Sequence, residues 1–503
     1  MASSPTGEAL DALFELVSNL CHGGLIYCAI TSLSMRFFDR VDELAALNEN
    51  WAADGARLFV LWGRRRVGKT ELLGRFIAKK RALYFEATDA ARRDQLRDLS
   101  VELARVSGNR LLAEQPLSSW QAALAAIEQY ATPERTIVVL DEFQYLAAQD
   151  RELGSLINRW WRTSGRHLPL VLVLAGSEVS FFERNVLAGQ MYGRRTGQLQ
   201  ITPLRYRSAA LFTPGYSAED TIRTYAVCGG MPYYLERFDD GVPLAQNILQ
   251  HILYRDGFLH EEAQLLLRQE LADPHNHIST LRAIAAGRTR HSEIMDWTGL
   301  SSAQVRQITS VLERMRLIEQ RRPVAAKLTS KKTSYAIIDG FLNFYFRFVD
   351  PYRSLLRTRS DAQRHLRQTV MPQLDHFVSK PCFEDICRLH MQETEGAHAV
   401  GSWWGTVPTG EGRRTERREI DAVAIDASGN AIALGSCKWT SGAMSATEES
   451  LLTRLQPYLP GGEGATRHFF YSRSDFDASL RRLAKADPER YRLFTPKDLF
   501  QGE

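Results

Sequence analysis

A glycine-rich octapeptide, Gly63-Arg-Arg-Arg-Val-Gly68-Lys69-Thr70, stands between an apolar run and a helical pattern. Loops with the spacing G-x-x-x-x-G-K-[ST] wrap their backbone N–H groups around nucleotide phosphates, and the following helix points its partial positive charge at them. Lys69 is expected to contact the β- and γ-phosphates, and the Thr70 hydroxyl to ligate Mg²⁺. The predicted nucleotide contacts are Gly63, Arg64, Arg65, Arg66, Val67, Gly68, Lys69, Thr70 and Glu71.

Two carboxylates follow another apolar run, in the segment TIVVLDEFQYL. Ligands of open parallel sheets bind at the carboxyl ends of strands, so we expect Asp141 and Glu142 beside the glycine-rich loop. Asp141 is suited to hold Mg²⁺, directly or through water. Glu142 is suited to polarise an attacking water as a general base. The predicted chemistry is hydrolysis of ATP with Mg²⁺, in which Thr70 and Asp141 serve the metal and Glu142 and Lys69 are catalytic.

Ser177 directly follows a third apolar run, VLVLAG. A polar residue at such a strand end can reach the γ-phosphate or the attacking water, which makes Ser177 a third candidate catalytic residue. A serine after Gly176 is equally typical of a helix cap. Both interpretations remain open at this point.

The elements that position these residues alternate between strand and helix. Apolar runs suited to buried strands occupy residues 58–62, 82–87, 136–140 and 168–175, with amphipathic stretches between them. This order predicts parallel strands joined by crossover helices, in a three-layer α/β domain over residues 35–204. A weaker strand at 198–201 is expected to complete the sheet.

Helical patterns replace the strands beyond residue 204. Residues 205–272 predict several helices with a break at the segment GGMP (229–232). Residues 273–350 then predict two short helices, a longer helix capped by Ser301 or Ser302, and a pair of strands. This is the order of a winged helix-turn-helix.

Basic residues cluster in the last helix and the paired strands of this predicted winged helix. Such residues suit contacts to DNA phosphates. Winged helices also serve as packing modules, and basic turns are often only solvated. DNA contact is the interpretation that we carry forward. The residues are Arg306, Arg314, Arg321, Arg322, Lys327, Lys331 and Lys332.

The final segment, residues 373–503, places Glu384 in a helix, Asp421 near the end of a strand, and Lys438 at the end of the next strand. With these three residues it resembles a restriction-endonuclease-like α/β domain. Such nucleases hold Mg²⁺ between acidic residues while a lysine positions the attacking hydroxide. The expected Glu-x-Lys is Ser436-Cys437-Lys438 here, so the metal would rest on Asp421, Glu384 and neighbouring Glu419. The site is therefore expected to be degenerate, and cutting of nucleic acid is in doubt.

Bulk composition limits the remaining possibilities. A chain of 503 residues is too long for one core, which predicts two to four domains. A net charge of +4 permits contact with nucleic acid without arguing for it. The six cysteines lack C-x-x-C spacing, so we expect reduced thiols, without a zinc site or a disulfide frame.

No membrane contact is expected. The longest uncharged opening stretch, residues 23–35, is shorter than the roughly 20 apolar residues of a membrane helix. Acidic residues precede it where a signal peptide carries positive charge, so we expect a cytoplasmic protein. Organised sequence begins at Met35, and residues 1–34 are expected to be a poorly defined extension.

Six motifs occur in one order over residues 35–350: FFDRVDEL, GRRRVGKTEL, VVLDEFQYL, LAGSEVSFF, YGRRTGQLQITPL and GGMPYYL. Together they resemble the archaeal-type ATPases of the STAND branch of the AAA+ superfamily. The resemblance implies an ATPase core, a helical lid at 205–272 and a winged helix, acting as a nucleotide-controlled switch. A homo-oligomer is compatible with such a switch.

The resemblance also implies roles for residues outside the glycine-rich loop. Arg40 lies in the N-terminal element that flanks the adenine in this family. Met231-Pro232 lies in the lid element that faces the nucleotide. Arg194 or Arg195 is placed to offer charge to the γ-phosphate, although a solvated surface pair is the favoured interpretation of these two arginines.

The leading hypothesis is an ATP-hydrolysing switch whose C-terminal half engages DNA. The alternative is an ATP-dependent signalling or scaffold protein in which the winged helix and the nuclease-like domain bind without catalysis. A DNA-binding regulator with a structural nucleotide is disfavoured, because Asp141-Glu142 retains both hydrolytic carboxylates.

Overall fold

The computed structural model describes residues 36–501 except 191–192, 272, 325, 327–332 and 409–413. The expected extension at 1–34, residues 409–413 and three of the predicted wing lysines (Lys327, Lys331 and Lys332) lie outside the described residues. The chain divides into two compact units, the first ending at Pro203 and the second beginning at Leu204.

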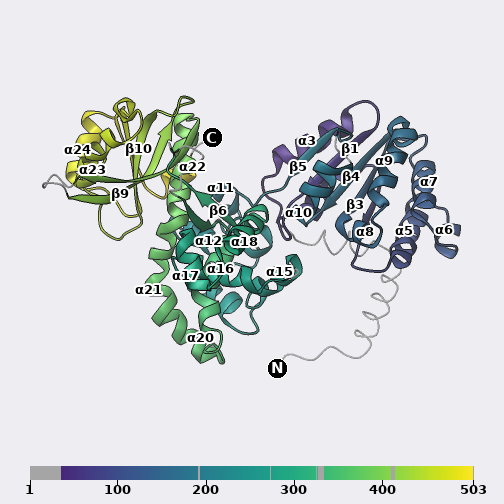
Figure 1. Cartoon of the computed structure of the whole chain (residues 1–503), viewed down its shortest axis with the longest axis horizontal. Helices are drawn as coiled ribbons and strands as arrows, with labels where there is room; N and C mark the ends of the chain where they lie inside the picture. The colour runs from purple at the N-terminus through teal and green to yellow at the C-terminus, as the bar shows by residue number, and fades with distance from the viewer. Residues whose placement is uncertain are drawn as a thin grey trace, which may run out of the picture. The chain divides into compact units, whose positions relative to one another are not determined.

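The first unit contains the predicted parallel sheet. Its order is β2-β3-β4-β1-β5, and every neighbouring pair is parallel (Figure 1). The buried apolar runs that predicted the strands form them, and the weak strand completes the sheet next to β1. The strands are β1 Arg57–Trp62, β2 Ala82–Glu86, β3 Thr136–Asp141, β4 Leu170–Gly176 and β5 Gly197–Gln200.

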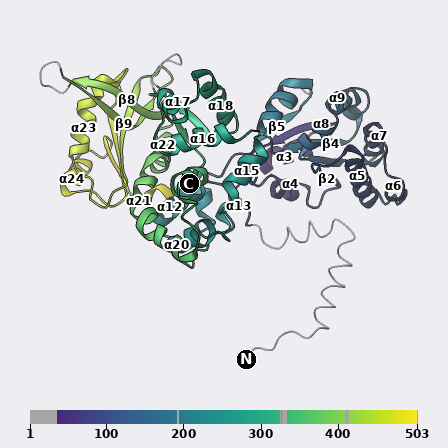
Figure 2. The same cartoon turned by 60° about the horizontal axis from the view of Figure 1, so that its bottom comes forward.

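Helices cover both sides of this sheet, as the three-layer prediction requires. In Figure 2, α8 and α9 lie on one side and α3 and α4 on the other. Apolar side chains of β1 to β4 pack against α5, α7, α8 and α9 in one core. The helices are α3 Val41–Ala52, α4 Lys69–Ile77, α5 Arg92–Ser107, α6 Leu111–Glu114, α7 Trp120–Tyr130, α8 Phe143–Gln149, α9 Leu153–Thr163, η1 Gly165–His167, α10 Val179–Phe181 and η2 Phe182–Gln190.

The second unit begins with the helices expected over residues 205–272, and the GGMP segment separates α12 from α13. Pro232 occupies the first turn of α13, where its missing N–H leaves no helical bond unmade. The helices are α11 Tyr206–Ala210, α12 Ala218–Cys228, α13 Pro232–Leu235, α14 Leu244–Asn247, η3 Ile248–Leu253 and α15 Glu262–Glu270.

Three helices and an antiparallel strand pair follow in the predicted order. Ser301 caps the third helix: its hydroxyl accepts from the Gln304 N–H, and the Gln304 side chain accepts from the Ser301 N–H at 3.0 Å. The order is the one that predicted a winged helix, an assignment that we carry into the proposal below. The elements are α16 His275–Ala285, α17 His291–Thr298, α18 Ser302–Arg314, β6 Ile318–Arg321 and β7 Ser334–Ile337.

A succession of helices connects these elements to the C-terminal sheet. The aromatic stretch at 341–352 is helical and largely buried, and the predicted helix around Glu384 is α22. The helices are α19 Gly340–Phe344, η4 Tyr345–Val349, η5 Asp350–Tyr352, α20 Arg359–His365, η6 Leu366–Val370, α21 Met371–Phe377, η7 Val378–Phe383 and α22 Glu384–Glu395.

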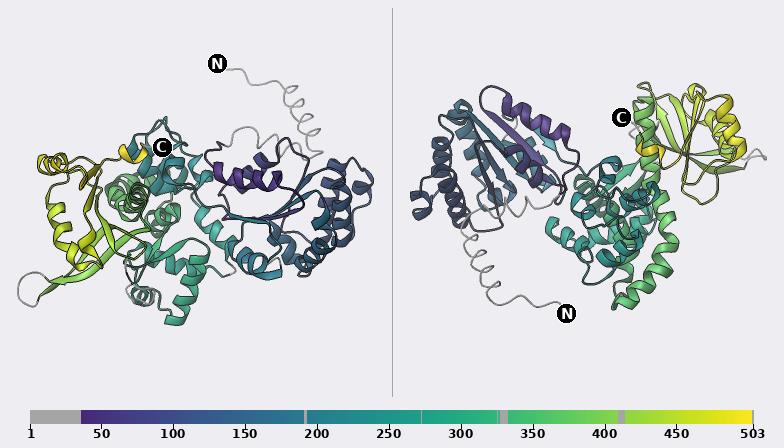
Figure 3. Two further views of the ribbon diagram at one scale, coloured as in Figure 1. Left: turned by 90° about the horizontal axis from the view of Figure 1, so that it is seen from above. Right: turned by 180° about the vertical axis from the view of Figure 1, so that it is seen from behind.

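The C-terminal sheet has the order β12-β11-β10-β9-β8, antiparallel from β8 to β10 and parallel from β10 to β12. Figure 3 shows the larger yellow helices, α23 and α24, on one face of this sheet and the green α22 on the other. The elements are β8 Ala399–Pro408, β9 Thr415–Ile425, β10 Ala431–Lys438, α23 Thr447–Leu455, η8 Gln456–Tyr458, η9 Gly462–Gly464, β11 Arg467–Ser472, α24 Ala478–Ala486, β12 Tyr491–Phe494 and η10 Asp498–Phe500.

One strand differs from its predicted extent. We expected a strand ending near Asp421, but β9 continues to Ile425, because the apolar residues after Asp421 pair with β10 and pack in the core. The chain turns only at Asp426, whose N–H donates to the Asn430 carbonyl at 3.0 Å. Asp421 therefore lies within a strand, and Lys438 ends β10 as predicted.

Polar contacts join the parts of the second unit. Arg473 of the C-terminal domain forms ion pairs with Glu219 of α12 at 2.8 Å and with Asp375 of α21 at 2.6 Å. The strand pair β6–β7 is joined to the sheet through Val324, whose N–H donates to the Ser402 carbonyl at 2.9 Å. Across the described part of the chain, no helix is long and apolar enough to cross a membrane.

Candidate functional site

The glycine-rich loop connects β1 to α4 and curls around the Lys69 ammonium. Gly68 caps α4 with φ 93°, and Arg66 within the loop has φ 70°, so the backbone adopts the left-handed turns of a phosphate-binding loop. Lys69 Nζ donates to the carbonyls of Gly63 at 2.9 Å and Arg64 at 3.2 Å. The predicted lysine thus lies inside the loop at the N-terminus of α4.

Contacts from outside the loop fix its path. A Cβ at Gly63 would lie 2.3 Å from the Ile201 carbonyl oxygen, so only glycine allows this approach. Arg40 donates from its guanidinium to the carbonyls of Val67 at 3.1 Å and Thr202 at 2.8 Å, and it pairs with Glu43 at 2.7 Å. The structure therefore ties Arg40 to the loop backbone, while its predicted contact with the adenine stays a prediction.

Asp141 ends β3 as a buried carboxylate beside Thr70. The Asp141 Oδ2 atom accepts from the Tyr84 hydroxyl at 2.5 Å and lies 3.5 Å from Thr70 Oγ1. Burial raises the pKa of the Asp141 carboxyl, and the nearby Lys69 ammonium opposes that rise. The two predicted metal ligands are therefore adjacent. Tyr84, on β2, was missed by sequence reasoning, although its place two residues before a strand end is a usable signal.

Glu142 follows Asp141 in a left-handed conformation with φ 51°, and its N–H donates to Asp141 Oδ1 at 2.8 Å. The Glu142 Oε2 atom accepts from the Ser177 hydroxyl at 2.6 Å, and it also accepts from the Gln144 amide. Gln144 further donates to Ser177 Oγ at 3.2 Å. The structure thus brings Ser177 against the predicted general base.

Gly176 provides the space for this arrangement. A Cβ at Gly176 would lie 2.2 Å from Gln144 Oε1, so a larger residue would displace the amide from Glu142. Sequence reasoning missed Gln144, although its position two residues after Glu142 on the same strand-to-helix turn was available as a signal. Hydrogen bonds to a carboxylate are stronger than those between neutral groups, so these donors fix where Glu142 points.

The residues present fit a nucleotide with Mg²⁺. The loop supplies N–H groups and an ammonium for phosphates, and a buried carboxylate next to a hydroxyl is a donor pair that Mg²⁺ prefers. Two other predicted nucleotide contacts bond to protein groups: Arg65 donates to the Tyr145 hydroxyl, and Glu71 accepts from Arg75 at 2.9 Å. The site therefore has groups for binding and for hydrolysis at one edge of the sheet.

Three further predicted contacts are Arg194, Arg195 and Pro232. Arg195 donates to the Leu187 carbonyl at 2.9 Å, and Arg194 is exposed. Pro232 belongs to the second unit. The roles of these residues at the nucleotide stay predictions.

The C-terminal candidate residues are also brought together. Lys438 Nζ lies 3.9 Å from Asp421 Oδ2, and Lys380 pairs with Glu384 at 3.1 Å and Glu419 at 3.2 Å. Burial, with repulsion from Asp421, raises the pKa of Glu384. Among the described residues, no group of three or more His, Cys, Asp or Glu is arranged to hold a metal ion.

A further carboxylate, Glu448 of α23, was missed by sequence reasoning. Its Oε2 atom accepts from the Ser436 hydroxyl at 2.7 Å and pairs with Lys438 at 3.3 Å. It thus lies beside the serine that replaces the expected glutamate. No spacing pattern links a helix residue to a strand twelve positions earlier, so this neighbour emerges only from the fold.

Residues 37–238 match a family model described as an ATPase domain predominantly from Archaea. This match supports an archaeal-type P-loop ATPase. Residues 345–450 match a second family, described as archaeal and bacterial proteins of unknown function.

Individual relatives come from Archaea as well. An uncharacterized protein of Methanocaldococcus jannaschii is 26% identical over 80% of this chain and 87% of its own length. An uncharacterized ATP-binding protein of the same organism is 44% identical over 9% of this chain and 76% of its own length. The Walker-type ATPase of Pyrococcus abyssi is 20% identical, with a TM-score of 0.49, over 62% of this chain and 96% of that chain.

Replacement of Glu142 by Gln separates binding from hydrolysis. We expect Glu142→Gln to bind Mg²⁺-ATP and to hydrolyse it at least about a hundredfold more slowly, because a general base contributes on that scale. Binding is measured by titration calorimetry and hydrolysis by phosphate release. Lys69→Ala is the control and is expected to lose binding itself. Loss of ATP binding in Glu142→Gln would show that this carboxylate has another role.

Proposed function

We propose that this chain is an Mg²⁺-dependent, ATP-hydrolysing switch whose C-terminal half engages DNA. The observation that carries the proposal is the placement of Glu142 between Asp141 and Ser177, at the strand edge that also holds the glycine-rich loop. A site that only bound nucleotide would not need a second, oriented carboxylate beside the metal ligand.

Each residue has a defined task in this proposal. The loop N–H groups and Lys69 bind the phosphates of ATP, while Thr70 and Asp141 hold Mg²⁺, which supplies charge neutralisation on the phosphate oxygens. Glu142 orients the attacking water and takes its proton. Ser177 and Gln144 hold the Glu142 carboxylate in place, since both donate to its Oε2 atom.

The proposed switch rests on the resemblance to the STAND branch of AAA+ ATPases. By that resemblance, the helices over 205–272 act as the lid and Pro232 faces the nucleotide. The proposal also has Arg194 or Arg195 offer its positive charge to the γ-phosphate.

DNA contact rests on the winged-helix order of α16 to β7. Arg306 of the candidate recognition helix α18 is exposed and donates to the neutral Ser302 hydroxyl at 2.8 Å, so its charge is not neutralised by that contact. Arg321 differs, because it pairs with Asp385 of α22 at 2.7 Å and stabilises the unit internally. We therefore assign duplex contact to α18 and not to Arg321.

The alternative function is an ATP-dependent scaffold without nuclease chemistry. The ion pairs of the C-terminal domain favour it for that domain. Lys380 pairs with Glu384 and Glu419, and Lys438 pairs with Glu448, so these carboxylates already have cationic partners. A metal ion must displace those ammonium groups, which Mg²⁺ does poorly because it keeps its own water shell.

DNA is expected to bind the purified chain and to change its rate of ATP hydrolysis. Affinity should fall steeply with added salt, because phosphate contacts release counterions. The measurement is phosphate release with and without single- and double-stranded DNA, together with binding at several salt concentrations. Arg306→Ala should reduce the slope of log K against log salt by the amount expected for roughly one phosphate contact. Arg321→Ala should leave that slope unchanged. ATP hydrolysis without any DNA binding at low salt would favour the scaffold function.

Binding of DNA is expected to occur without its cleavage. Linear, circular and branched DNA incubated with Mg²⁺ or Mn²⁺ should remain intact, because lysines already pair with the carboxylates that would hold the metal and Ser436 replaces the expected glutamate. Gel electrophoresis of the products tests this expectation. Robust cutting by the wild type that disappears in Asp421→Ala would contradict it.

A further inference from the structure

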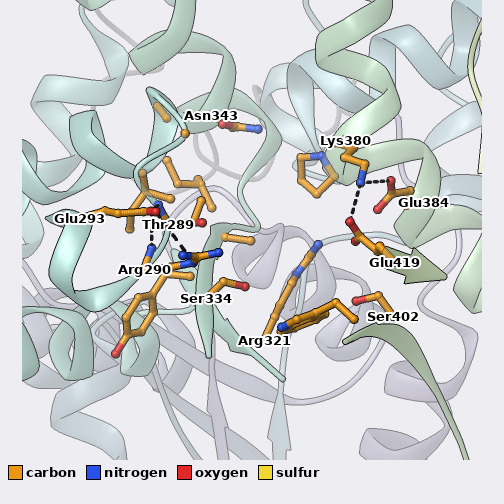
Figure 4. A pocket seen from close by; sticks show the side chains of 18 of the residues that line it. Thr289, Arg290, Glu293, Arg321, Ser334, Asn343, Lys380, Glu384, Ser402 and Glu419 are labelled. Atoms are coloured by element: carbon orange, nitrogen blue, oxygen red, sulfur yellow. Dashed lines mark hydrogen bonds and ion pairs between the residues drawn. The ribbon is translucent and has the colours of Figure 1, made fainter. Parts of the chain in front are cut away.

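A cavity of about 840 Å³ lies inside the second unit, between the elements of the winged helix and the C-terminal sheet. Figure 4 shows Arg290 and Glu293, at the start of α17, on one side of it. Lys380, Glu384 and Glu419 lie on the other side. The volume is near the upper end of the roughly 300–1,000 Å³ typical of pockets for drug-sized molecules, so the cavity exceeds the needs of a single phosphate.

One face of the β8–β9 hairpin lines this cavity. Ser402, Trp404 and Thr406 alternate along β8, so their side chains share a face, and all three line the cavity. On β9, Arg417 pairs with Thr406 in the strand register, and Glu419 pairs with Trp404. An exposed guanidinium and a half-buried indole are thereby neighbours on this wall.

The charges of the lining favour an anionic ligand. Two of its five cations have carboxylate partners within 3.3 Å: Arg321 pairs with Asp385 at 2.7 Å, and Lys380 pairs with Glu384 and Glu419. The lining contains three glutamates, namely Glu293, Glu384 and Glu419, against the cations Arg290, Arg321, Arg347, Lys380 and Arg417.

Three arginines keep charge for a ligand. Arg417 has no ion-pair partner within the described ranges of the chain. Arg347 donates to the neutral Gln373 amide at 3.1 Å. Arg290 lies 3.8 Å from Glu293, whose other oxygen already accepts the N–H groups of Thr289 and Arg290 at 3.0 Å. These arginines come from β9, η4 and the cap of α17, so they surround the cavity.

We infer that this cavity binds a single strand of nucleic acid, with its phosphates at Arg417, Arg347 and Arg290 and a base stacked on Trp404. Available arginines around an aromatic ring are the combination that binds single strands, because every base offers a face for stacking. The bases of a duplex are stacked on each other and do not offer that face. This inference rests on the proposed function, in which the C-terminal half engages DNA.

The cavity extends to candidate residues of the C-terminal domain. Lys380 and Glu419 line the cavity, and Asp421 follows two residues later on β9. The cavity is thus a second DNA site, separate from α18, and its ligand is the backbone of a single strand instead of a duplex groove.

The test is the binding of fluorescently labelled oligo(dT) to the full chain, measured by anisotropy over a range of salt. Trp404→Ala is expected to weaken binding by about tenfold without changing the salt slope, because stacking carries no charge. Arg417→Ala is expected to reduce the slope of log K against log salt by about 0.7, the value for one phosphate contact on a single strand. Arg418→Ala, the neighbouring arginine on the other face of β9, is the matched control and should bind as the wild type does.

Three further results decide the inference. Trp404→Phe retains a ring and should keep most of the affinity, which separates lost stacking from a failure of Trp404→Ala to fold. Wild-type affinity in both Trp404→Ala and Arg417→Ala would overturn the cavity assignment while leaving DNA engagement intact. Equal competition by polyglutamate would overturn it too, since the cavity would then take an acidic peptide. Absence of binding to both single-stranded and duplex DNA by the wild type would instead contradict the proposed function.

Discussion

The position of β4 between β1 and β3 is the constraint on which the nucleotide site depends. All three strands are parallel, so their carboxyl ends meet at one edge. The loop after β1, the carboxylates after β3 and the serine after β4 become neighbours in consequence. The Gly63 N–H donates to the Gly176 carbonyl at 3.3 Å, which ties the start of the loop to the strand that presents Ser177. Three segments distant in sequence therefore lie together at one edge of the sheet.

Much of the first unit was predictable from its sequence because its strands are buried on both faces and are continuously apolar, as β3 and β4 are. The glycine-rich motif predicted the end of β1, and Asp141-Glu142 predicted the end of β3. Tyr84 and Gln144 were missed although each lies two residues from a predicted feature, Tyr84 before the end of β2 and Gln144 after Glu142, because the sequence alone does not show their contacts to Asp141 and Glu142. In the C-terminal domain, the extent of β9 depends on strand pairing, and the position of Glu448 beside Ser436 depends on helix packing. A linear sequence pattern records neither.

The second unit uses arginine in two ways. Some arginines stabilise the fold: Arg388 lies buried, donates to the Asp421 carbonyl at 2.7 Å and pairs with Asp385 at 2.5 Å. Such buried pairs leave no charge for a ligand, and removal of one partner is costly. Others, such as Arg417, have no such partner within the described residues. Basic composition alone does not separate the two kinds, and Arg321, which was predicted to contact DNA, belongs to the first kind because it pairs with Asp385 at 2.7 Å.

Mg²⁺ dependence tests the central claim most directly, because the proposed function assigns the metal to Thr70 and to Asp141 at the end of β3. Phosphate release from ATP is measured for the wild type and Asp141→Asn over a range of Mg²⁺ concentrations. The account predicts that the wild type hydrolyses ATP only with Mg²⁺, and that Asp141→Asn needs much more Mg²⁺ or shows no turnover. Turnover by Asp141→Asn with the wild-type Mg²⁺ dependence would contradict the assignment of the site.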